Sequence, residues 1–197
     1  MSPLANVGLL LINTIGSLAL LIVLLRFLLQ LVRADFYNPI SQMIVKLTSP
    51  LLTPLRRVIP GFGGLDIASL LLAYGIQIVT MALILLVAGM GADIPWANLL
   101  VWAPLGLFGL LLKIYFWGLI ITVIASWIAP NSYNPALILI NQILEPVVRP
   151  IRAKMPDLGG IDLSPIVVFL LIQVLEIIVI GPLAQMLAVP RGLMFGL

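Results

Sequence analysis

The sequence contains no cysteine and no histidine, and only 9% of its 197 residues are charged. The lack of cysteine excludes disulfides, thiolate nucleophiles and cysteine metal ligands. The lack of histidine excludes imidazole acid–base chemistry and histidine metal sites. A Gly-rich phosphate loop and a nucleophile elbow are also missing. These absences predict a protein that is not an enzyme and that carries no metal or other cofactor.

The chain is instead rich in apolar residues. They make up 62% of the chain, and the mean hydropathy is +1.25. A typical soluble domain is about one quarter charged, so this composition is typical of a membrane protein. The net charge of +3 is too small to indicate direct binding of nucleic acid.

Long uncharged or nearly uncharged runs predict four membrane-spanning helices and an all-α membrane fold. At about 1.5 Å per residue, each run can cross a hydrocarbon core of about 30 Å. The first run has no basic segment before it and no cleavage site after it, so it is not expected to be a signal peptide. Arg26, near its end, is expected to reach the interface. Trp96–Trp102 is expected to form a separate interfacial turn. The predicted spans are Ala5–Val32, Ile67–Met90, Pro104–Ile128 and Pro165–Ala188.

One motif occurs twice, with a constant offset of 96 residues. Tyr37-Asn38-Pro39 recurs as Tyr133-Asn134-Pro135, and the prolines, an arginine, a glycine pair and an aspartate follow at the same spacing. The sequence therefore predicts two tandem repeats, 1–92 and 93–197. Each has two membrane helices joined by a connection, at 33–66 in the first repeat and 129–164 in the second.

Each connection is predicted to begin with an amphipathic helix that lies in the interface or forms a re-entrant element. Asn38 and Asn134 are expected N-caps, because each precedes a proline suited to the first helical position. We expect the helices to end after about ten residues, at Pro50 and Pro146, since a proline breaks the hydrogen-bond ladder. The closely spaced prolines beyond them favour an extended path.

Asp66 and Asp162 follow the two glycine pairs and precede apolar runs. A catalytic carboxylate pair is one interpretation. Helix capping is the preferred one, because a turn precedes each aspartate and a membrane helix follows it.

Basic residues gather in the two connections, and only Arg191 and the terminal amine fall on the opposite face. By the positive-inside rule the connections are expected in the cytoplasm and both termini outside. Same-direction repeats predict a pseudo-two-fold axis along the membrane normal. These side chains either only fix the topology, or they bind anionic lipid headgroups or a cytoplasmic protein. The candidate surface consists of Arg56, Arg57, Arg149, Arg152 and Lys154.

Polar residues inside the spans are rare and therefore candidates for function. Lys113 and Glu176 lie at similar expected depths, which predicts a structural ion pair; a proton or ion relay, snorkelling and a partner protein are the alternatives. Gln77 and Gln173 are matched by the repeat offset. They are expected to form hydrogen bonds between helices or, alternatively, to line a narrow polar path.

The repeated motif resembles the YggT family of small bacterial membrane proteins, called YlmG-like in cyanobacteria and plastids. The resemblance covers nearly the whole chain and departs from the repeat at Ala68-Ser69, where the second copy has Ser164-Pro165. It implies a multi-pass protein of the bacterial inner membrane. It links the chain to osmotic-stress tolerance, to division or nucleoid organisation and, in plastids, to cofactor assembly on a membrane cytochrome. It implies no catalytic residue.

Two functions follow as hypotheses. The first is a non-enzymatic scaffold or assembly factor that binds lipid and other membrane proteins. The second is a small ion or solute channel or transporter that works as a homo-oligomer, lined by Lys113, Glu176, Gln77 and Gln173.

Overall fold

The computed structural model describes residues 2–59, 61, 63–128, 132–156, 162–190 and 192–194. Four helices are long and apolar enough to cross a membrane: α1 (Pro3–Leu31), α3 (Ile67–Val87), α4 (Trp96–Ile128) and the stretch Ser164–Met186. The last comprises α6 (Ser164–Leu175), the π-helical turn η2 (Glu176–Ile180) and α7 (Gly181–Met186). Two connecting helices, α2 (Pro39–Val58) and α5 (Pro135–Arg152), and the 3₁₀ turn η1 (Gly91–Asp93) complete the chain. The expected all-α fold with four apolar spans is confirmed.

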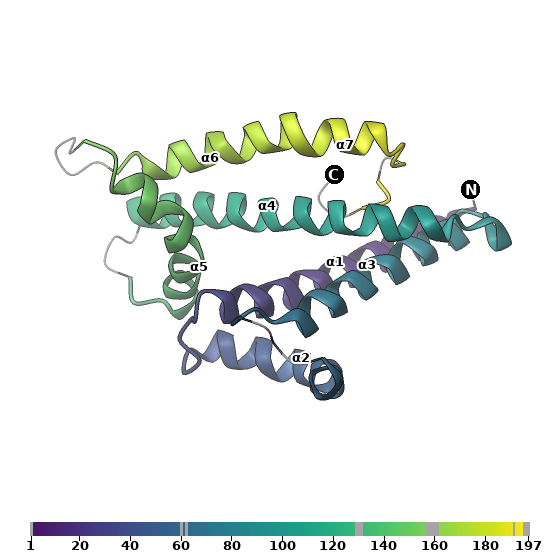
Figure 1. The fold of residues 1–197 in the computed structure, drawn as a ribbon, viewed down its shortest axis with the longest axis horizontal. Helices are drawn as coiled ribbons and strands as arrows, with labels where there is room; N and C mark the ends of the chain where they lie inside the picture. Colours follow the sequence, from purple (N-terminus) through teal and green to yellow (C-terminus); the bar gives the residue numbers. More distant parts are fainter. Residues whose placement is uncertain are drawn as a thin grey trace.

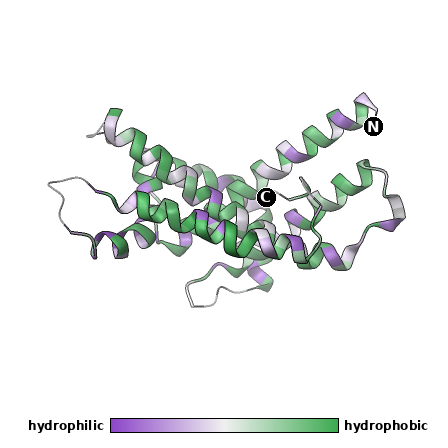
Figure 2. Cartoon of the chain, turned by 90° about the horizontal axis from the view of Figure 1, so that it is seen from above, coloured by the Kyte–Doolittle hydropathy of each residue, from purple (hydrophilic) through white to green (hydrophobic). Residues whose placement is uncertain are grey.

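The spanning helices run back and forth, as Figure 1 shows. The connections that contain α2 and α5 join them on the left of that view, and the N-terminus and the turn between α3 and α4 lie on the right. Seen from above in Figure 2, the spanning helices are mostly hydrophobic. Both repeats therefore run in the same direction, as expected for repeats with an even number of spans.

The core lies where the two repeats meet. Helix α3 packs along α1 and also against α4, whereas α4 and α6 are packed less closely. At Gly106 of α4 an added Cβ would lie 2.9 Å from Nε2 of Gln77 and 3.0 Å from Sδ of Met194. Glycine at this position thus lets α3 and the turned-back C-terminal segment approach α4.

The predicted ends of the connecting helices at Pro50 and Pro146 are wrong. Helix α2 has 20 residues and continues through Pro50 and Pro54, and α5 has 18 and continues through Pro146 and Pro150. The prolines of each helix are four residues apart, so they share one face, and all four are exposed. Each therefore removes a hydrogen bond on the unpacked side and bends the helix without breaking it. Figure 1 shows this bend in α2, whose last turns are seen end-on.

The separate turn expected at Trp96–Trp102 is also wrong, because α4 begins at Trp96 and continues past Pro104. Proline cannot donate to the carbonyl of Leu100, four residues earlier. That carbonyl instead accepts a hydrogen bond of 2.9 Å from the hydroxyl of Tyr74 on α3. A contact between the repeats thus supplies the bond that the proline removes.

Candidate functional site

A buried charged cluster lies at the start of α3 in the first repeat. Asp66 is the N-cap of α3: its Oδ1 accepts a hydrogen bond of 3.3 Å from the backbone N–H of Ser69. Its Oδ2 accepts from the Ser69 hydroxyl and from Nη2 of Arg56, which belongs to α2. The Arg56 guanidinium also donates to Oε1 of Gln30 at 3.0 Å. Asp66 is only 3% exposed, so α1, α2 and α3 are joined through a buried carboxylate.

Arg26 of α1 belongs to the same cluster, and it turns into the protein instead of extending into solvent. Its side chain is buried, with 7% of the residue exposed, and its guanidinium carbon lies 5.8 Å from the ring centroid of Phe36. The charges of Arg56 and Asp66 both act on it. Among the described residues, Nε and Nη1 of Arg26 are buried and have no hydrogen-bond partner.

The second repeat builds the equivalent pair near its surface. Nε of Arg152 lies 2.8 Å from Oδ2 of Asp162, and Nη1 lies 3.6 Å from Oε2 of Glu145. Asp162 does not occupy the N-cap position, which belongs to Leu163. Its Oδ1 nevertheless accepts from the backbone N–H of Ser164 at 2.9 Å and from the Ser164 hydroxyl at 2.5 Å. It therefore still covers the first turn of α6.

Both aspartates are held in their charged form. Burial alone would raise the pKa of Asp66, but the hydrogen bonds from Ser69 and Arg56, and the charge of Arg56, hold that pKa below its ordinary value. The pKa of Asp162 is also lowered: burial again opposes the shift, and the bonds from Ser164 and Arg152 outweigh it. A carboxylate held by its partners in this way suits a structural role better than proton transfer.

The two connections meet at their Asn-Pro residues. Asn38 caps α2 through a 2.9 Å bond from the N–H of Ile40, and Asn134 caps α5 through a 2.9 Å bond from the N–H of Ala136. The side-chain amide of Asn38 also donates to the carbonyl of Pro135 at 2.8 Å. The N–H of Asp35 donates to Oε1 of Gln142 at 3.1 Å. These bonds join α2 and α5 into one surface, which we call the connection surface.

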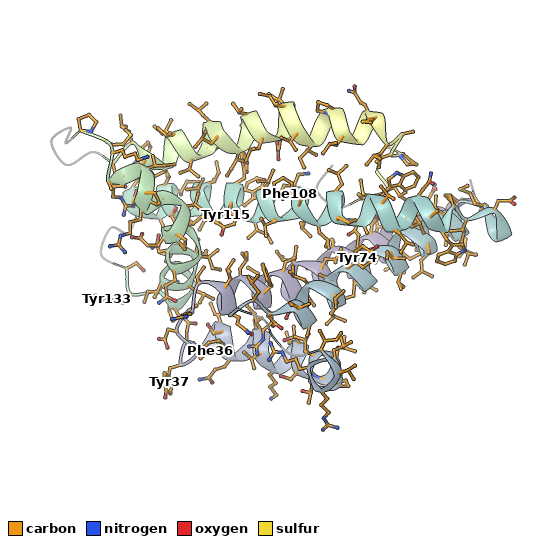
Figure 3. All side chains as sticks on the ribbon, viewed as in Figure 1. Phe36, Tyr37, Tyr74, Phe108, Tyr115 and Tyr133 are labelled. Carbon is orange, nitrogen blue, oxygen red and sulfur yellow. The ribbon has the colours of Figure 1, made fainter. Side chains whose placement is uncertain are left out.

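The tyrosines that begin the two motifs lie on the connection surface and point away from the chain. Tyr37 is 91% exposed and Tyr133 is 90% exposed. Figure 3 shows both at the outer edge of the same end of the molecule. The asparagine and proline of each motif start a helix, whereas the tyrosine side chains contribute almost nothing to packing.

The candidate basic residues do not form one cluster. Arg57, Arg149, Arg152 and Lys154 are exposed, and Arg56 is half-buried in its pair with Asp66. Arg149 and Arg33 line a polar cavity of about 470 Å³ between the end of α1 and α5, together with Glu145 and Gln142. Two arginines and one glutamate thus face a shared cavity where the repeats meet.

The expected ion pair between Lys113 and Glu176 is wrong. The salt bridges in the described part of the chain are those of Arg56 and Arg152, and none joins Lys113 to Glu176. Glu176 begins the π-helical turn, in which its carbonyl accepts from the N–H of Gly181, five residues later. The wider turn changes the direction of side chains relative to a regular helix. Pro182, the second residue after the turn, cannot donate to the carbonyl of Ile178.

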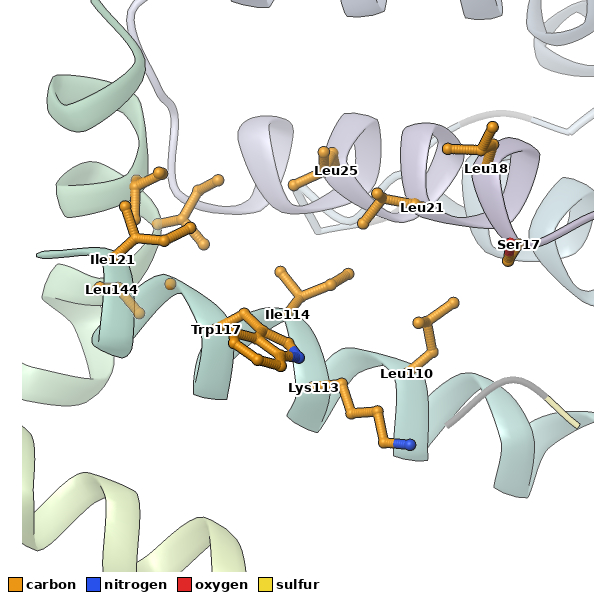
Figure 4. Close-up of a pocket in the computed structure, with 13 residues that line it drawn as sticks. Ser17, Leu18, Leu21, Leu25, Leu110, Lys113, Ile114, Trp117, Ile121 and Leu144 are labelled. Atoms are coloured by element: carbon orange, nitrogen blue, oxygen red, sulfur yellow. The ribbon is translucent and has the colours of Figure 1, made fainter. Parts of the chain in front are cut away.

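Lys113 instead lines an apolar cavity of about 480 Å³ between α1, α4 and α5. In Figure 4 its alkyl chain follows α4 and its ammonium group points away from α1. Apart from Lys113 and Ser17, the walls are apolar side chains and Gly118. This cavity is suited to a hydrocarbon chain and offers no continuous polar path.

The structure does not bring Gln77 and Gln173 together. Gln77 is completely buried between α3 and α4, and Gln173 is half-buried on α6, which packs on α4 and α5. Neither side-chain amide makes a hydrogen bond within the described residues, and both polar atoms of Gln77 are without a partner. The expected hydrogen bonding between helices is therefore not present there.

Sequence reasoning missed the cluster around Arg26. The signal was available, because Arg26 corresponds to Thr122 in the second copy and is thus a charge that the repeat does not require. The described residues contain no group of three or more Asp or Glu side chains that could hold a metal ion.

The CCB3/YggT family matches residues 5–87 and 101–183, which correspond to the two tandem repeats. The chain belongs to the CCB3/YggT family. It is 54% identical over 182 residues to an uncharacterized protein of Pseudomonas aeruginosa, covering 92% of each chain. It is 40% identical to the uncharacterized protein YggT of Escherichia coli K12, over 84% of this chain and 85% of that one. No solved structure matches this chain. The names of these relatives state no activity.

Proposed function

We propose that this CCB3/YggT protein is a non-enzymatic membrane scaffold or assembly factor, and that its connection surface holds other membrane proteins. The exposed pair Tyr37 and Tyr133 supports this proposal most directly. Both copies carry a large aromatic side chain that the fold does not use. Tyrosine supplies contact area at low entropic cost and is enriched at protein interfaces.

The proposal includes a location. The protein lies in the bacterial inner membrane, its basic connections face the cytoplasm, and its termini face outside, since basic loops remain on the cytoplasmic side. The exposed Arg57, Arg149 and Lys154 contact anionic headgroups. Roles in osmotic-stress tolerance or in biogenesis of membrane complexes agree with such a scaffold. The protein does not bind nucleic acid directly.

Site-specific photo-crosslinking in native membranes tests the scaffold. A photoreactive phenylalanine analogue would replace Tyr37 or Tyr133, and a matched control would replace Met186 of α7, which is 84% exposed at the opposite end of the fourth span. We expect discrete protein adducts from positions 37 and 133 and none from 186. A lack of adducts at 37 and 133, or the same adducts from all three positions, would contradict the proposal.

A channel or transporter formed by a homo-oligomer is the second candidate. It is favoured by Glu176, an ionisable residue inside a span that begins a π-helical turn, a feature common at functional sites. Ion flux into liposomes would be compared for the wild type, Glu176→Gln, Lys113→Ala and the exposed control Glu145→Gln. Flux that is lost only in the two intramembrane variants would favour the channel over the scaffold.

A further inference from the structure

The first repeat buries a cation that the described part of the chain leaves unpaired. Arg26 is 7% exposed, and its Nε and Nη1 have no hydrogen-bond partner among the described residues. Phe36 faces the guanidinium at 5.8 Å, but a ring face cannot accept the hydrogen bonds of a whole guanidinium fork. Buried charges are normally paired and hydrogen-bonded, because leaving them unpaired costs several kcal/mol.

The carboxylate of Asp66, in the same cluster, already has hydrogen-bond partners. Asp66 accepts hydrogen bonds from Arg56 and from both the N–H and the hydroxyl of Ser69. Two arginines and one aspartate leave the cluster with one excess positive charge. The cluster therefore lacks an anion.

The second repeat shows that this charge is not required by the fold. Thr122 stands in place of Arg26, and Ser126 in place of Gln30, while the pair of Arg152 and Asp162 is kept. The same arrangement of two spans and a connecting helix forms there without the extra cation. Arg26 is thus an addition to the first repeat.

We propose that Arg26 and Arg56 form a binding site for one phosphate group of an anionic ligand. A guanidinium presents paired N–H donors that match phosphate oxygens. Arg26 lies five residues before the end of α1, about 7.5 Å along the helix axis, which places it near the level of lipid headgroups. Nη2 of Arg26 is not among the nitrogens closed off from solvent, and the Arg56 side chain is 36% exposed, so a ligand can approach from that side. The phosphate belongs either to a lipid headgroup or to a free anion. This site does not depend on the scaffold proposal.

Binding to the purified full chain in a maltoside detergent, which carries no phosphate, tests the site. The probes are dioctanoyl phosphatidylglycerol, dioctanoylglycerol with the same tails but no phosphate, and inorganic phosphate. The variants are Arg26→Thr, which copies the second repeat, Arg26→Met, and the control Lys46→Thr, which removes an exposed cation of α2. Melting temperature and native mass spectrometry report stability and the number of ligands bound.

We expect one phosphatidylglycerol to bind each wild-type chain and to raise its melting temperature, with no effect of dioctanoylglycerol. Affinity should fall by about tenfold or more in both Arg26 variants, since a charge-assisted contact is worth at least about tenfold. In Lys46→Thr it should fall by less than about twofold. Without ligand, Arg26→Met should melt at a higher temperature than the wild type, because it removes an unpaired buried charge. If inorganic phosphate competes with phosphatidylglycerol, the natural ligand is a free anion. If it does not compete, the natural ligand is a lipid.

Equal binding by the wild type and both Arg26 variants would overturn the site. A loss of affinity in Lys46→Thr as large as that in the Arg26 variants would also overturn it, because the attraction would then be diffuse. If Arg26→Thr fails to fold, the comparison of Arg26→Met with and without ligand still decides the question. A lower melting temperature of Arg26→Met in the absence of any phosphate would show that the charge is already paired, and would reject the proposal.

Discussion

In the first repeat the pair Arg56–Asp66 has a carboxylate that is 3% exposed, whereas in the second repeat Asp162 is 39% exposed and Arg152 is 50% exposed. The motif residues are the same in both copies, so their neighbours must cause the difference. Gln30 holds Arg56 and Ser69 closes over Asp66 in the first copy. Ser126 and Pro165 occupy those positions in the second. The motif thus determines which charges pair, and the surrounding side chains determine how much the pair contributes to stability.

The largest expected effect comes from removing the buried carboxylate. Asp66→Asn should lower the free energy of unfolding by about 3 kcal/mol, because it removes the carboxylate that pairs with Arg56 and offsets the charge of the buried Arg26. Denaturant unfolding in detergent measures this loss. Asp162→Asn is the matched control and should cost about 1 kcal/mol or less. Equal losses of stability in the two variants would show that burial of the carboxylate does not change how much the pair stabilises its repeat.

An intermediate effect is expected at the matched glutamines. The Gln77 amide is completely buried and has no partner among the residues that the structure describes, so Gln77→Met should raise the free energy of unfolding by about 1–2 kcal/mol. Gln173→Met should change it by less than about 0.5 kcal/mol, because Gln173 is only half-buried. The same denaturation experiment compares the two. A loss of stability in Gln77→Met would mean that the amide has a partner in the membrane.

The spanning helices could be predicted from the sequence because long apolar runs have few other stable arrangements in a bilayer. Asn38 and Asn134 could be placed as caps because an Asn-Pro pair acts locally. The connecting helices were predicted too short, since the penalty of Pro50 or Pro146 depends on which face the proline occupies. The pairing of Lys113 with Glu176 failed because it was predicted from depth alone, and depth does not determine the direction in which each side chain leaves its helix.

Arg26 shows a different limit of sequence reasoning. Its depth in the first apolar run predicted a side chain that reaches the interface. Whether a side chain turns to solvent or into the protein depends on what α2 and α3 place beside it. In the structure these helices bring Arg56 and Asp66 close to Arg26 and bury its guanidinium. These two neighbours of Arg26 lie 30 and 40 residues later in the chain, and periodicity in α1 cannot reveal them.

The smallest expected effect is the acid response of the exposed pair. The pKa of Asp162 is lowered in the folded protein, because the hydrogen bonds from Ser164 and Arg152 outweigh the effect of burial. The stabilisation that ionised Asp162 gives to the folded protein is therefore complete above the ordinary carboxyl pKa of about 4. It is lost as pH falls through the lower pKa that Asp162 has in the folded protein. The difference in unfolding free energy between the wild type and Asp162→Asn should be at most about 1 kcal/mol at neutral pH, since water screens an exposed pair.

Urea unfolding across the acid range should show this difference becoming smaller as pH falls. The same measurement on Asp66→Asn should show a larger difference that also becomes smaller as pH falls. If this difference widens on acidification for Asp162→Asn, the pKa of Asp162 is raised in the folded protein. The two repeats would then not share a stabilising charged pair.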